Sequence, residues 1–389
     1  MEPKIAVIHG DLNVSGGSEA LCFRIIETLK DDYRITLITD RTVNIRKANA
    51  LFGTNLKDND FKVKVSLLPF ILNTLSKSRF IKWRWALLQK SAKRASDSYD
   101  LLFSASNEAD FGRRGIQYLH FPKAVDELHL RKTGELSDDL ARGSSVFSRL
   151  YLWIYRRRLR PDYENVRINR TLCNSEFTQT VFGNFYKAEC EVVYPPITDL
   201  SAYARPWPER EDGFVCAGRI EPAKNVVRTV RILKKLKELG LNLHLHILGK
   251  PWDRAYAKKV AAECRGTDFL LYEGEVSREE LNKLMGSHKY FIHGYDFEHF
   301  GMASAEAVSA GCIPFVPNSG GQVEIIGKNP LLCYSDEYDA VEKIDRVCRD
   351  AGLQENIRED LKSVLPNFSS DNFRRRIKEI VREELRRKA

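Results

Sequence analysis

The sequence predicts an α/β fold built from two doubly wound domains, each with a parallel sheet covered by helices. Short apolar runs typical of buried strands alternate with helical segments in both halves of the 389-residue chain. The pair Pro195-Pro196 separates the two series, because consecutive prolines end strand pairing and stiffen a connection. The chain is also too long for one ordinary core. We therefore predict domains at residues 1–196 and 197–370, and a charged helix at 371–389 that crosses back to the first domain.

The first half opens with a strand, a helix and a second strand, a βαβ unit that implies a parallel sheet. These segments are residues 4–9, 18–29 and 34–39. Further buried strands are expected at 101–104, 116–120 and 170–174.

The second half repeats the alternation. Strands are expected at 213–218, 241–248, 269–272, 290–293, 313–316 and 331–334, and helices at 226–239, 254–262, 277–285 and 301–310. Ser277 with Glu280 three residues later is a capping box, which marks the start of a helix. Two such domains would face each other across a cleft at the carboxyl ends of their strands.

Composition indicates a globular protein, with 43% hydrophobic and 30% charged residues. No stretch approaches the roughly 20 apolar residues of a membrane span, and the first ten residues form an expected strand rather than a signal peptide. We expect a cytoplasmic protein that is peripheral on a membrane. The eight cysteines show no Cys-x-x-Cys spacing, so we interpret them as buried free thiols.

A segment with two carboxylates, Glu298 and Glu306, is the most informative motif. The two residues lie eight positions apart around the start of the expected 301–310 helix, so both can point toward one ligand from different depths. The free N–H groups of Phe300, Gly301 and Met302 at the helix start suit an anion such as diphosphate. This combination predicts a sugar-nucleotide pocket.

Two cations lie on the turn that follows the first strand of the second domain. Arg219 and Lys224 can converge on a diphosphate from this strand-to-helix turn. Taken alone, they could equally be solvated loop residues. The downstream carboxylates in the same domain favour the functional interpretation.

The first domain offers weaker signals. Gly16 and Gly17 join its first strand to its first helix, where glycine permits close approach of a ligand and leaves helix N–H groups free. His120 ends an expected strand, where it can reach the cleft, although a strand-end histidine is more often structural. We interpret Asp58 and Asp60 as loop residues, and we identify no metal-ligand set.

Cationic runs concentrate in the first half of this chain, whose net charge is +9. Phe61–Ser96 contains nine Lys or Arg and no acid, and Leu140–Pro161 contains six Arg and no acid. If residues 75–95 form a helix, its tryptophans and cations suit anionic lipid headgroups. The expected membrane surface consists of Trp83, Arg84, Trp85, Arg156, Arg157 and Arg158. The alternative is aromatic side chains packed in the core beneath a solvated cationic face.

Together these residues resemble the family-four retaining glycosyltransferases, which have the GT-B fold of two Rossmann-like domains. The specific motifs are Gly-Arg-x4-Lys at 218–224 and Glu-x7-Glu at 298–306 with its Phe-Gly step. Three local matches, Ser-Gly-Gly-Ser-Glu at 15–19, Tyr-Leu-His-Phe-Pro at 118–122 and Val-Val-Tyr-Pro-Pro at 192–196, resemble the α1,2-mannosyltransferases that extend lipid-linked oligosaccharides. Where those enzymes have three glycines before Glu-Arg, this chain has Ser-Gly-Gly-Ser-Glu-Ala.

The resemblance implies roles for individual residues. Arg219 and Lys224 would hold the donor diphosphate, Glu306 the ribose hydroxyls, and Glu298 with the backbone of Phe300, Gly301 and Met302 the donor sugar. His120 would contact the transferred sugar, Gly16 and Gly17 would approach the donor phosphates or the acceptor, and Val276 would line the donor site.

Retention of anomeric configuration without a metal or other cofactor is also implied. Cations and helix N–H groups can neutralise a departing diphosphate, as Mg²⁺ does elsewhere. GDP-mannose is the favoured donor and a UDP-sugar the alternative, with a glycan or lipid-linked acceptor.

Other functions remain open at this stage. Within the enzyme class they are a UDP-sugar-dependent glucosyl- or N-acetylglucosaminyltransferase, an epimerase and a phosphorylase. A non-catalytic binder of anionic lipid or nucleic acid is the alternative from another class. We expect no nucleic-acid partner, because a binding module does not require the set of cations and carboxylates in the second half.

Overall fold

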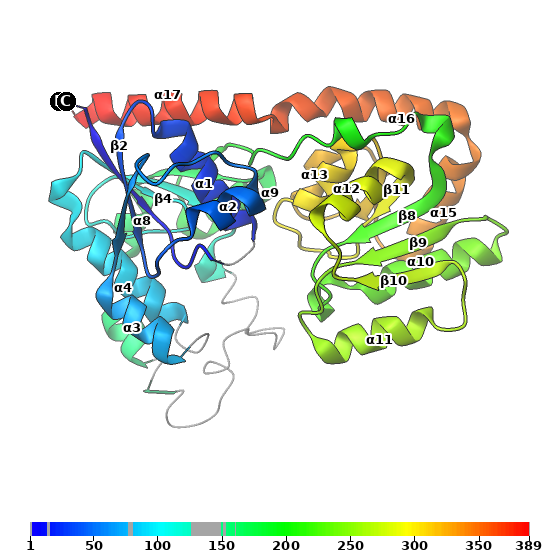
Figure 1. Ribbon diagram of the computed structural model, residues 1–389, viewed down its shortest axis with the longest axis horizontal. Helices are drawn as coiled ribbons and strands as arrows, with labels where there is room; N and C mark the ends of the chain where they lie inside the picture. The colour runs from blue at the N-terminus through cyan, green and yellow to red at the C-terminus, as the bar shows by residue number, and fades with distance from the viewer. Residues whose placement is uncertain are drawn as a thin grey trace. The chain divides into compact units, whose positions relative to one another are not determined.

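The computed structural model describes residues 2–13, 16–76, 81–125, 149–150, 153–159 and 161–388. The chain divides into two compact units, whose elements are labelled in Figure 1: Met1–Pro195 with Phe373–Ala389, and Pro196–Asn372. Each unit has its own parallel sheet and its own hydrophobic core.

The first unit contains a seven-stranded sheet in the order β3-β2-β1-β4-β5-β6-β7, and its paired strands are all parallel. The strands are β1 (Lys4–Ile8), β2 (Arg34–Thr39), β3 (Lys62–Val65), β4 (Leu101–Ser104), β5 (Ile116–Leu119), β6 (Arg170–Cys173) and β7 (Glu191–Val192). Its helices are α1 (Gly17–Leu29), α2 (Ile45–Phe52), α3 (Leu67–Ser76), α4 (Ile81–Arg94), α8 (Tyr163–Arg167), α9 (Glu176–Tyr186) and most of α17 (Ser370–Lys388).

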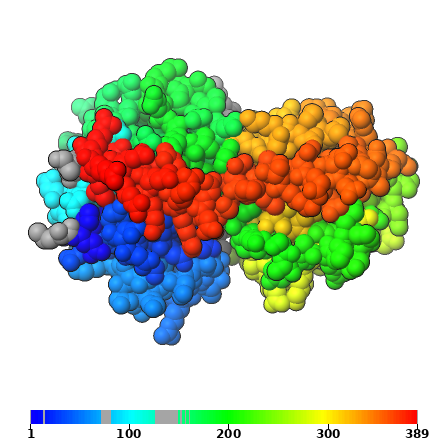
Figure 2. All heavy atoms as spheres, turned by 90° about the horizontal axis from the view of Figure 1, so that it is seen from above, coloured from blue at the N-terminus to red at the C-terminus, as the bar shows by residue number. Residues whose placement is uncertain are grey.

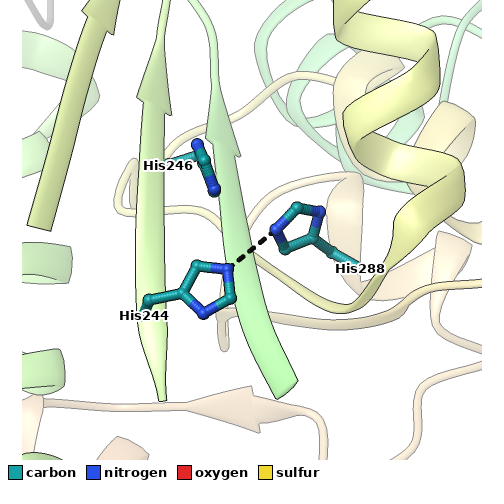
Figure 3. A group of neighbouring side chains, drawn as sticks. All are labelled: His244, His246 and His288. Carbon is teal, nitrogen blue, oxygen red and sulfur yellow. Dashed lines mark hydrogen bonds between the residues drawn. The ribbon is translucent and has the colours of Figure 1, made fainter. Parts of the chain in front are cut away.

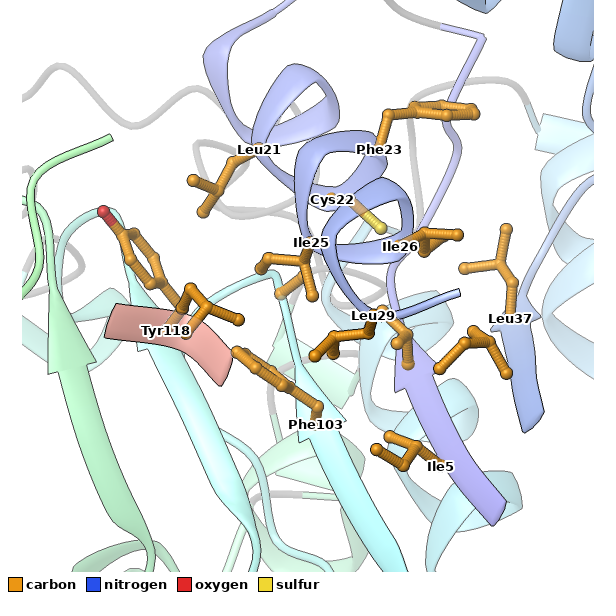
Figure 4. Packing of buried hydrophobic residues seen from close by; sticks show 14 of the residues in the cluster. Ile5, Leu21, Cys22, Phe23, Ile25, Ile26, Leu29, Leu37, Phe103 and Tyr118 are labelled. Atoms are coloured by element: carbon orange, nitrogen blue, oxygen red, sulfur yellow. The ribbon is translucent and has the colours of Figure 1, made fainter. Parts of the chain in front are cut away.

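The core of this unit forms where α1 packs on the sheet. Figure 4 shows Leu21, Ile25 and Leu29 of α1 lying over Phe103 and Tyr118 of the strands. All five are at most 2% exposed, and α4 covers the other face of the sheet with Leu88 and Ala92, which is why the central strands are continuous apolar runs rather than alternating ones.

The C-terminal helix α17 completes the same core. Its apolar residues Phe373, Ile377, Ile380 and Val381 are buried against the first unit, although they lie at the other end of the chain. Glu384 of α17 accepts hydrogen bonds of 2.8 Å from Arg114. Figure 2 shows α17, in red, lying over N-terminal residues of this unit, in blue.

The second unit contains a six-stranded parallel sheet in the order β10-β9-β8-β11-β12-β13. The strands are β8 (Glu211–Ala217), β9 (His244–Leu248), β10 (Leu270–Gly274), β11 (His288–Ile292), β12 (Ile313–Pro317) and β13 (Cys333–Tyr334). The helices are α10 (Val226–Glu238), α11 (Arg254–Cys264), α12 (Arg278–Ser287), α13 (Met302–Ser309), α14 (Gln322–Ile325), α15 (Glu337–Arg349) and α16 (Ala351–Val364).

The predicted fold class, two doubly wound parallel sheets, is confirmed. The Ser277 side chain caps α12 by accepting the Glu280 N–H at 3.2 Å. The helix expected at 75–95 is instead α3 followed by α4, and residues 77–80 between them lie outside the described part. All eight cysteines are free thiols, and six of them are buried.

Candidate functional site

Both sheets reverse their strand order at one point, and several of the predicted site residues follow the strands at those points. In the second unit the reversal lies between β8 and β11, and in the first unit between β1 and β4. Connections leave in opposite directions at such a point, which opens a crevice at the carboxyl ends of the strands where ligands bind in doubly wound folds. Arg219 and Lys224 follow β8, and Glu298 follows β11.

Lys224 and Glu298 form a close ion pair in the second unit. Lys224 Nζ lies 2.5 Å from Glu298 Oε2, and the two side chains are only 16% and 18% exposed. The ammonium also lies 4.6 Å from the centre of the Tyr295 ring. Gly294 permits this approach, because a Cβ there would lie 2.5 Å from the carbonyl oxygen of Asn225. The structure therefore brings together two residues that are 74 positions apart.

The charge of Glu298 is maintained by its neighbours. Burial alone would raise its pKa, but the Lys224 ammonium, with help from His293 and His299, lowers the pKa from 4.5 to about 2. His293 Nε2 lies 3.5 Å from Glu298 Oε2. Burial lowers the pKa of both histidines to about 4, so at neutral pH they are uncharged. The site thus holds an ionised carboxylate beside one ammonium and two neutral imidazoles.

Sequence reasoning did not identify His293 or His299 as candidate residues. The available signals were the position of His293 at the end of an expected strand and that of His299 next to Glu298.

Arg219 lies on the turn after β8, with its side chain 54% exposed. Its Nη2 is 3.1 Å from Glu221 Oε1, and its guanidinium lies 5.3 Å from the centre of the Trp252 ring. The turn packs tightly against Gly249, where a Cβ would lie 1.6 Å from the Gly218 carbonyl oxygen. Arg219 therefore extends from a fixed backbone and has N–H groups directed to solvent as well as to Glu221.

Glu306 is buried in α13, only 6% exposed, and bonds to the Nη2 atom of Arg278. Arg278 begins α12 and its side chain is 50% exposed, so one side of this pair faces solvent. Sequence reasoning missed Arg278 because nothing in the spacing between residues 278 and 306 signals the contact.

The start of α13 is held by glycines. Gly301 precedes the helix with φ of 107°, a conformation that favours glycine. The Gly321 N–H donates a 2.8 Å hydrogen bond to the Glu298 carbonyl, and a Cβ on Gly320 would lie 2.2 Å from that oxygen. Glu298 is thereby fixed beside the N–H groups at the start of α13, which have no partners within the helix.

Phe300 and Val276 have packing roles. The Phe300 side chain is 3% exposed, and its ring centre lies 5.7 Å from that of Phe368. Phe300 can therefore offer a ligand its backbone rather than its ring. Val276 is half-buried against the core cluster that includes Phe291.

In the first unit, His120 is half-buried after β5 and its ring lies next to the strand-order reversal. Its backbone N–H donates to Asn107 Oδ1 at 2.7 Å, and its Nε2 lies 3.1 Å from the Ala105 carbonyl oxygen. Ala105 and Asn107 follow β4, and Asn107 has a φ of 70°. The loop after β4 therefore fixes the position of His120.

His9 follows β1 at the same edge and was not identified from the sequence. It is 2% exposed, and neither ring nitrogen has a hydrogen-bond partner among the described residues. Burial, with the nearby charges of His120 and Lys123, lowers its pKa to about 3. Gly16 and Gly17 stand at the start of α1, where a Cβ on Gly16 would lie 2.4 Å from Glu19 Oε2. Ser15 lies outside the described residues.

Two residues of the predicted membrane surface, Arg84 and Trp85, have partners within the first unit. Arg84 Nη2 forms a 2.7 Å ion pair with Asp40 Oδ2, with side chains 11% and 3% exposed. Trp85 packs on the core, and the Lys123 ammonium lies 3.9 Å from the centre of its ring. Arg84 therefore faces inward toward the buried Asp40, and Trp85 is half-buried between the core and the exposed Lys123.

The other predicted membrane residues differ from one another. Trp83 is half-buried, Arg157 and Arg158 are exposed, and the Arg156 side chain lies outside the described part.

Helix α3, which packs against α4, carries exposed apolar side chains instead. Leu67, Leu68 and Ile71 are 69%, 57% and 40% exposed. Helices within the described ranges include none with the length and hydropathy of a membrane span.

Comparisons with known proteins give a consistent result. Residues 202–364 match the family model described as glycosyl transferases group 1. The chain is 21% identical to the GDP-Man:Man(3)GlcNAc(2)-PP-Dol alpha-1,2-mannosyltransferase of Dictyostelium discoideum, over 99% of this chain and 86% of that protein.

Two solved structures share the fold. A glycosyltransferase from Rickettsia africae matches with a TM-score of 0.67 and 16% identity, over 99% of each chain. The Anabaena protein HepE, in complex with UDP and glucose, matches with a TM-score of 0.67 and 14% identity, over 98% of this chain and all of that one.

Proposed function

We propose that this chain, which has the GT-B fold and whose residues 202–364 match the group 1 glycosyl transferases, transfers mannose from GDP-mannose to a lipid-linked glycan. The observation that carries the proposal is the buried Lys224–Glu298 pair at the strand-order reversal of the second unit. It places a cation for a diphosphate beside an ionised acceptor for sugar hydroxyls.

Lys224 and Arg219 would bind the donor diphosphate. Both follow β8, and the start of α13 adds backbone N–H groups that favour an anion. Lys224 is held by Glu298 and Tyr295, and these contacts orient its ammonium for the donor. These groups would stabilise the negative charge that develops on the departing nucleoside diphosphate, with no need for a metal.

Glu298 and Glu306 would bind different hydroxyl groups of the donor. Glu298, ionised by virtue of Lys224, would accept hydrogen bonds from the sugar. Glu306 would accept them from the ribose, and the half-exposed Arg278 would move aside or share the carboxylate.

We propose transfer with retention of configuration. The acceptor hydroxyl would attack C1 on the face that the diphosphate leaves, and a departing phosphate oxygen would take its proton. In this scheme the C1–O bond to diphosphate breaks, the C1–O bond to the acceptor forms, and no side chain acts as nucleophile. His120 would contact the transferred sugar, while Gly16 and Gly17 would allow the acceptor or the phosphates to approach the start of α1.

The lipid-linked acceptor is supported by the name of the Dictyostelium relative and by α3. Leu67, Leu68 and Ile71 form an exposed apolar face beside α4, which carries the half-buried Lys90 and the exposed Arg94. We propose that this face, rather than Arg84 and Trp85, contacts an anionic membrane. Peripheral binding follows from apolar area combined with nearby cations.

Direct transfer assays test the donor and reaction. GDP-mannose, UDP-glucose and UDP-N-acetylglucosamine are each incubated with the protein and a polyprenyl-diphosphate-linked glycan, and products are identified by mass spectrometry. We expect a mannosylated product whose new linkage has the anomeric configuration of the donor, both before and after treatment with EDTA. Transfer from a UDP-sugar alone would show that the donor is that UDP-sugar and not GDP-mannose. Release of no nucleotide from any donor, with salt-sensitive binding to DNA, would instead indicate a non-catalytic binder.

Liposome co-sedimentation tests the membrane face. Leu67→Asp/Leu68→Asp should bind anionic vesicles at least tenfold more weakly. The control Leu51→Asp, which also changes an exposed leucine of the first unit, should bind like the wild type. Equal binding by both variants would rule out α3 as the contact.

A further inference from the structure

Three histidines meet at the amino-terminal edge of the second unit's sheet, away from the candidate donor site. Figure 3 shows His244 and His246 on β9 and His288 at the start of β11, with their rings close together. The ring centres are 4.8 to 5.2 Å apart, and one ring nitrogen of each residue lies within 4.8 Å of those of the other two. The proposed sugar transfer has no use for this cluster.

The sheet brings the three rings together. His244 and His246 are two positions apart on one strand, so they project from the same face. β8 lies between β9 and β11, and its residue opposite His244 is Gly213. A Cβ at position 213 would lie 2.4 Å from His244 Cε1 and Nε2. The ring of His244 therefore occupies the space that a side chain at 213 would take, and can reach His288.

Hydrogen bonds orient two of the rings as metal ligands usually are. His288 Nδ1 lies 2.8 Å from the Leu284 carbonyl oxygen, so Nδ1 carries the proton and Nε2 has a free electron pair. His246 Nδ1 lies 3.0 Å from Glu273 Oε1, so here too Nδ1 carries the proton and Nε2 has a free electron pair. Metal-binding histidines typically donate their second ring N–H to a carbonyl or carboxylate in this manner.

A carboxylate completes the donor set. Glu211 Oε2 lies 3.6 Å from His244 Nε2 and 3.8 Å from His288 Nε2, and the two nitrogens are 2.9 Å apart. A triangle with these sides has its centre about 2.0 Å from each corner, which matches the roughly 2.0–2.1 Å of a Zn–N bond. Three of the four ligands therefore already have suitable separations, and His246, one of whose ring nitrogens lies within 4.8 Å of those of the other two histidines, has to move closer to complete the site.

We propose that His244, His246, His288 and Glu211 bind Zn²⁺ or a similar divalent transition metal. Three imidazoles and one carboxylate favour Zn²⁺ over Mg²⁺ and Ca²⁺, which prefer oxygen ligands. Four protein ligands leave no position for substrate, so the ion is structural and clamps β8, β9 and β11 together. On binding, the proton that lies between His244 Nε2 and His288 Nε2 moves to His244 Nδ1, so that both Nε2 atoms can bind the metal.

Metal stoichiometry in the full-length chain tests the proposal. The protein is treated with a chelator, dialysed and titrated with Zn²⁺ against a chromophoric competitor. We expect one tightly bound ion per chain, an increase in melting temperature on binding, and a visible Co²⁺ spectrum of tetrahedral type without thiolate charge-transfer bands.

Variants identify the ligands. His246→Gln and Glu211→Gln should each weaken binding tenfold or more, whereas Glu209→Gln, which removes the same charge from an exposed residue nearby, should not. Circular dichroism of the metal-free variants checks that they fold. The Glu211 side chain is 52% exposed, so its replacement leaves the core unchanged. Unchanged affinity in both ligand variants, a thiolate band with Co²⁺, or no binding by the folded wild type would each overturn the proposal.

Discussion

Replacing Lys224 with methionine should destabilise the second unit through Glu298. Methionine keeps much of the volume of lysine but removes the ammonium that lies 2.5 Å from Glu298 Oε2. The carboxylate would remain buried, 18% exposed, without its principal counter-charge. Removing one partner of a buried ion pair is costly because the other charge is left in a poorly solvated position.

The pKa of Glu298 sets the expected loss of unfolding free energy in Lys224→Met. Its fall from 4.5 to about 2 corresponds to about 3 kcal/mol, since one pH unit is worth about 1.4 kcal/mol. We therefore expect Lys224→Met to lose about 3 kcal/mol of unfolding free energy at pH 7, within the roughly 3–5 kcal/mol typical of broken buried pairs.

The loss should depend on pH. In the wild type the depressed pKa of Glu298 contributes stability that is fully present above pH 4.5 and is lost as the pH falls toward 2. In Lys224→Met burial acts without the ammonium, so the pKa rises above 4.5 and the folded state is favoured by protonation. The variant should therefore recover stability between pH 7 and pH 5 while the wild type changes little.

Hydrogen exchange of peptides from β11 and α10, measured in increasing urea, reports on this unit alone. The double variant Lys224→Met/Glu298→Gln removes both charges and should regain most of the stability but remain inactive in mannose transfer. Equal stability of Lys224→Met and the wild type at pH 7, or a difference that widens at pH 5, would refute the electrostatic reasoning.

Three further substitutions test other parts of the structure. Gly294→Ala places a Cβ 2.5 Å from the Asn225 carbonyl oxygen, so it should lower the unfolding free energy by about 1–3 kcal/mol and weaken donor binding. In the same thermal melts the control Gly352→Ala, in helix α16, should leave stability unchanged or increase it. Glu306→Gln should raise the KM for the donor about tenfold with a smaller effect on kcat, as expected for a lost charged hydrogen bond; an unchanged KM would exclude Glu306 from ribose binding. Ile380 is fully buried in α17, so Ile380→Ala should lower the unfolding free energy of the first unit by about 2–5 kcal/mol, measured in urea. If an alanine substitution at an exposed position of α17 lowered the unfolding free energy more, the packing role of this helix would be contradicted.

Local sequence signals predicted the strands of the parallel sheets well. Strands such as 101–104 are short apolar runs, and Lys224 and Glu298 lie on the loops that follow two such strands. Because adjacent parallel strands end at one edge, residues after β8 and β11 must lie near each other. Their pairing follows from topology, although 74 positions separate them.

The remaining contacts depend on long-range packing that no local pattern encodes. Arg84 lies in a cationic run, yet it turns inward because Asp40, far away in sequence, is buried beside it. Arg278 bonds to Glu306 only because α12 and α13 are neighbours. The spacing of His244 and His246 on a strand was a usable signal for a metal site, but the register that brings His288 to them was not.

The two polar clusters of the second unit lie at opposite ends of the same strand, and this bears on whether a bound metal could take part in transfer. His288 begins β11 and His293 follows its end, beside Glu298. Five residues of strand at about 3.3 Å each separate the clusters by about 16 Å. A metal bound by His288 is therefore too far away to contact a diphosphate held by Lys224, so a zinc-binding chain and a metal-independent transfer are compatible. Removing the ion should lower the melting temperature and leave the KM of the remaining folded protein for the donor unchanged; a parallel loss of donor affinity would show that the two ends of β11 are coupled.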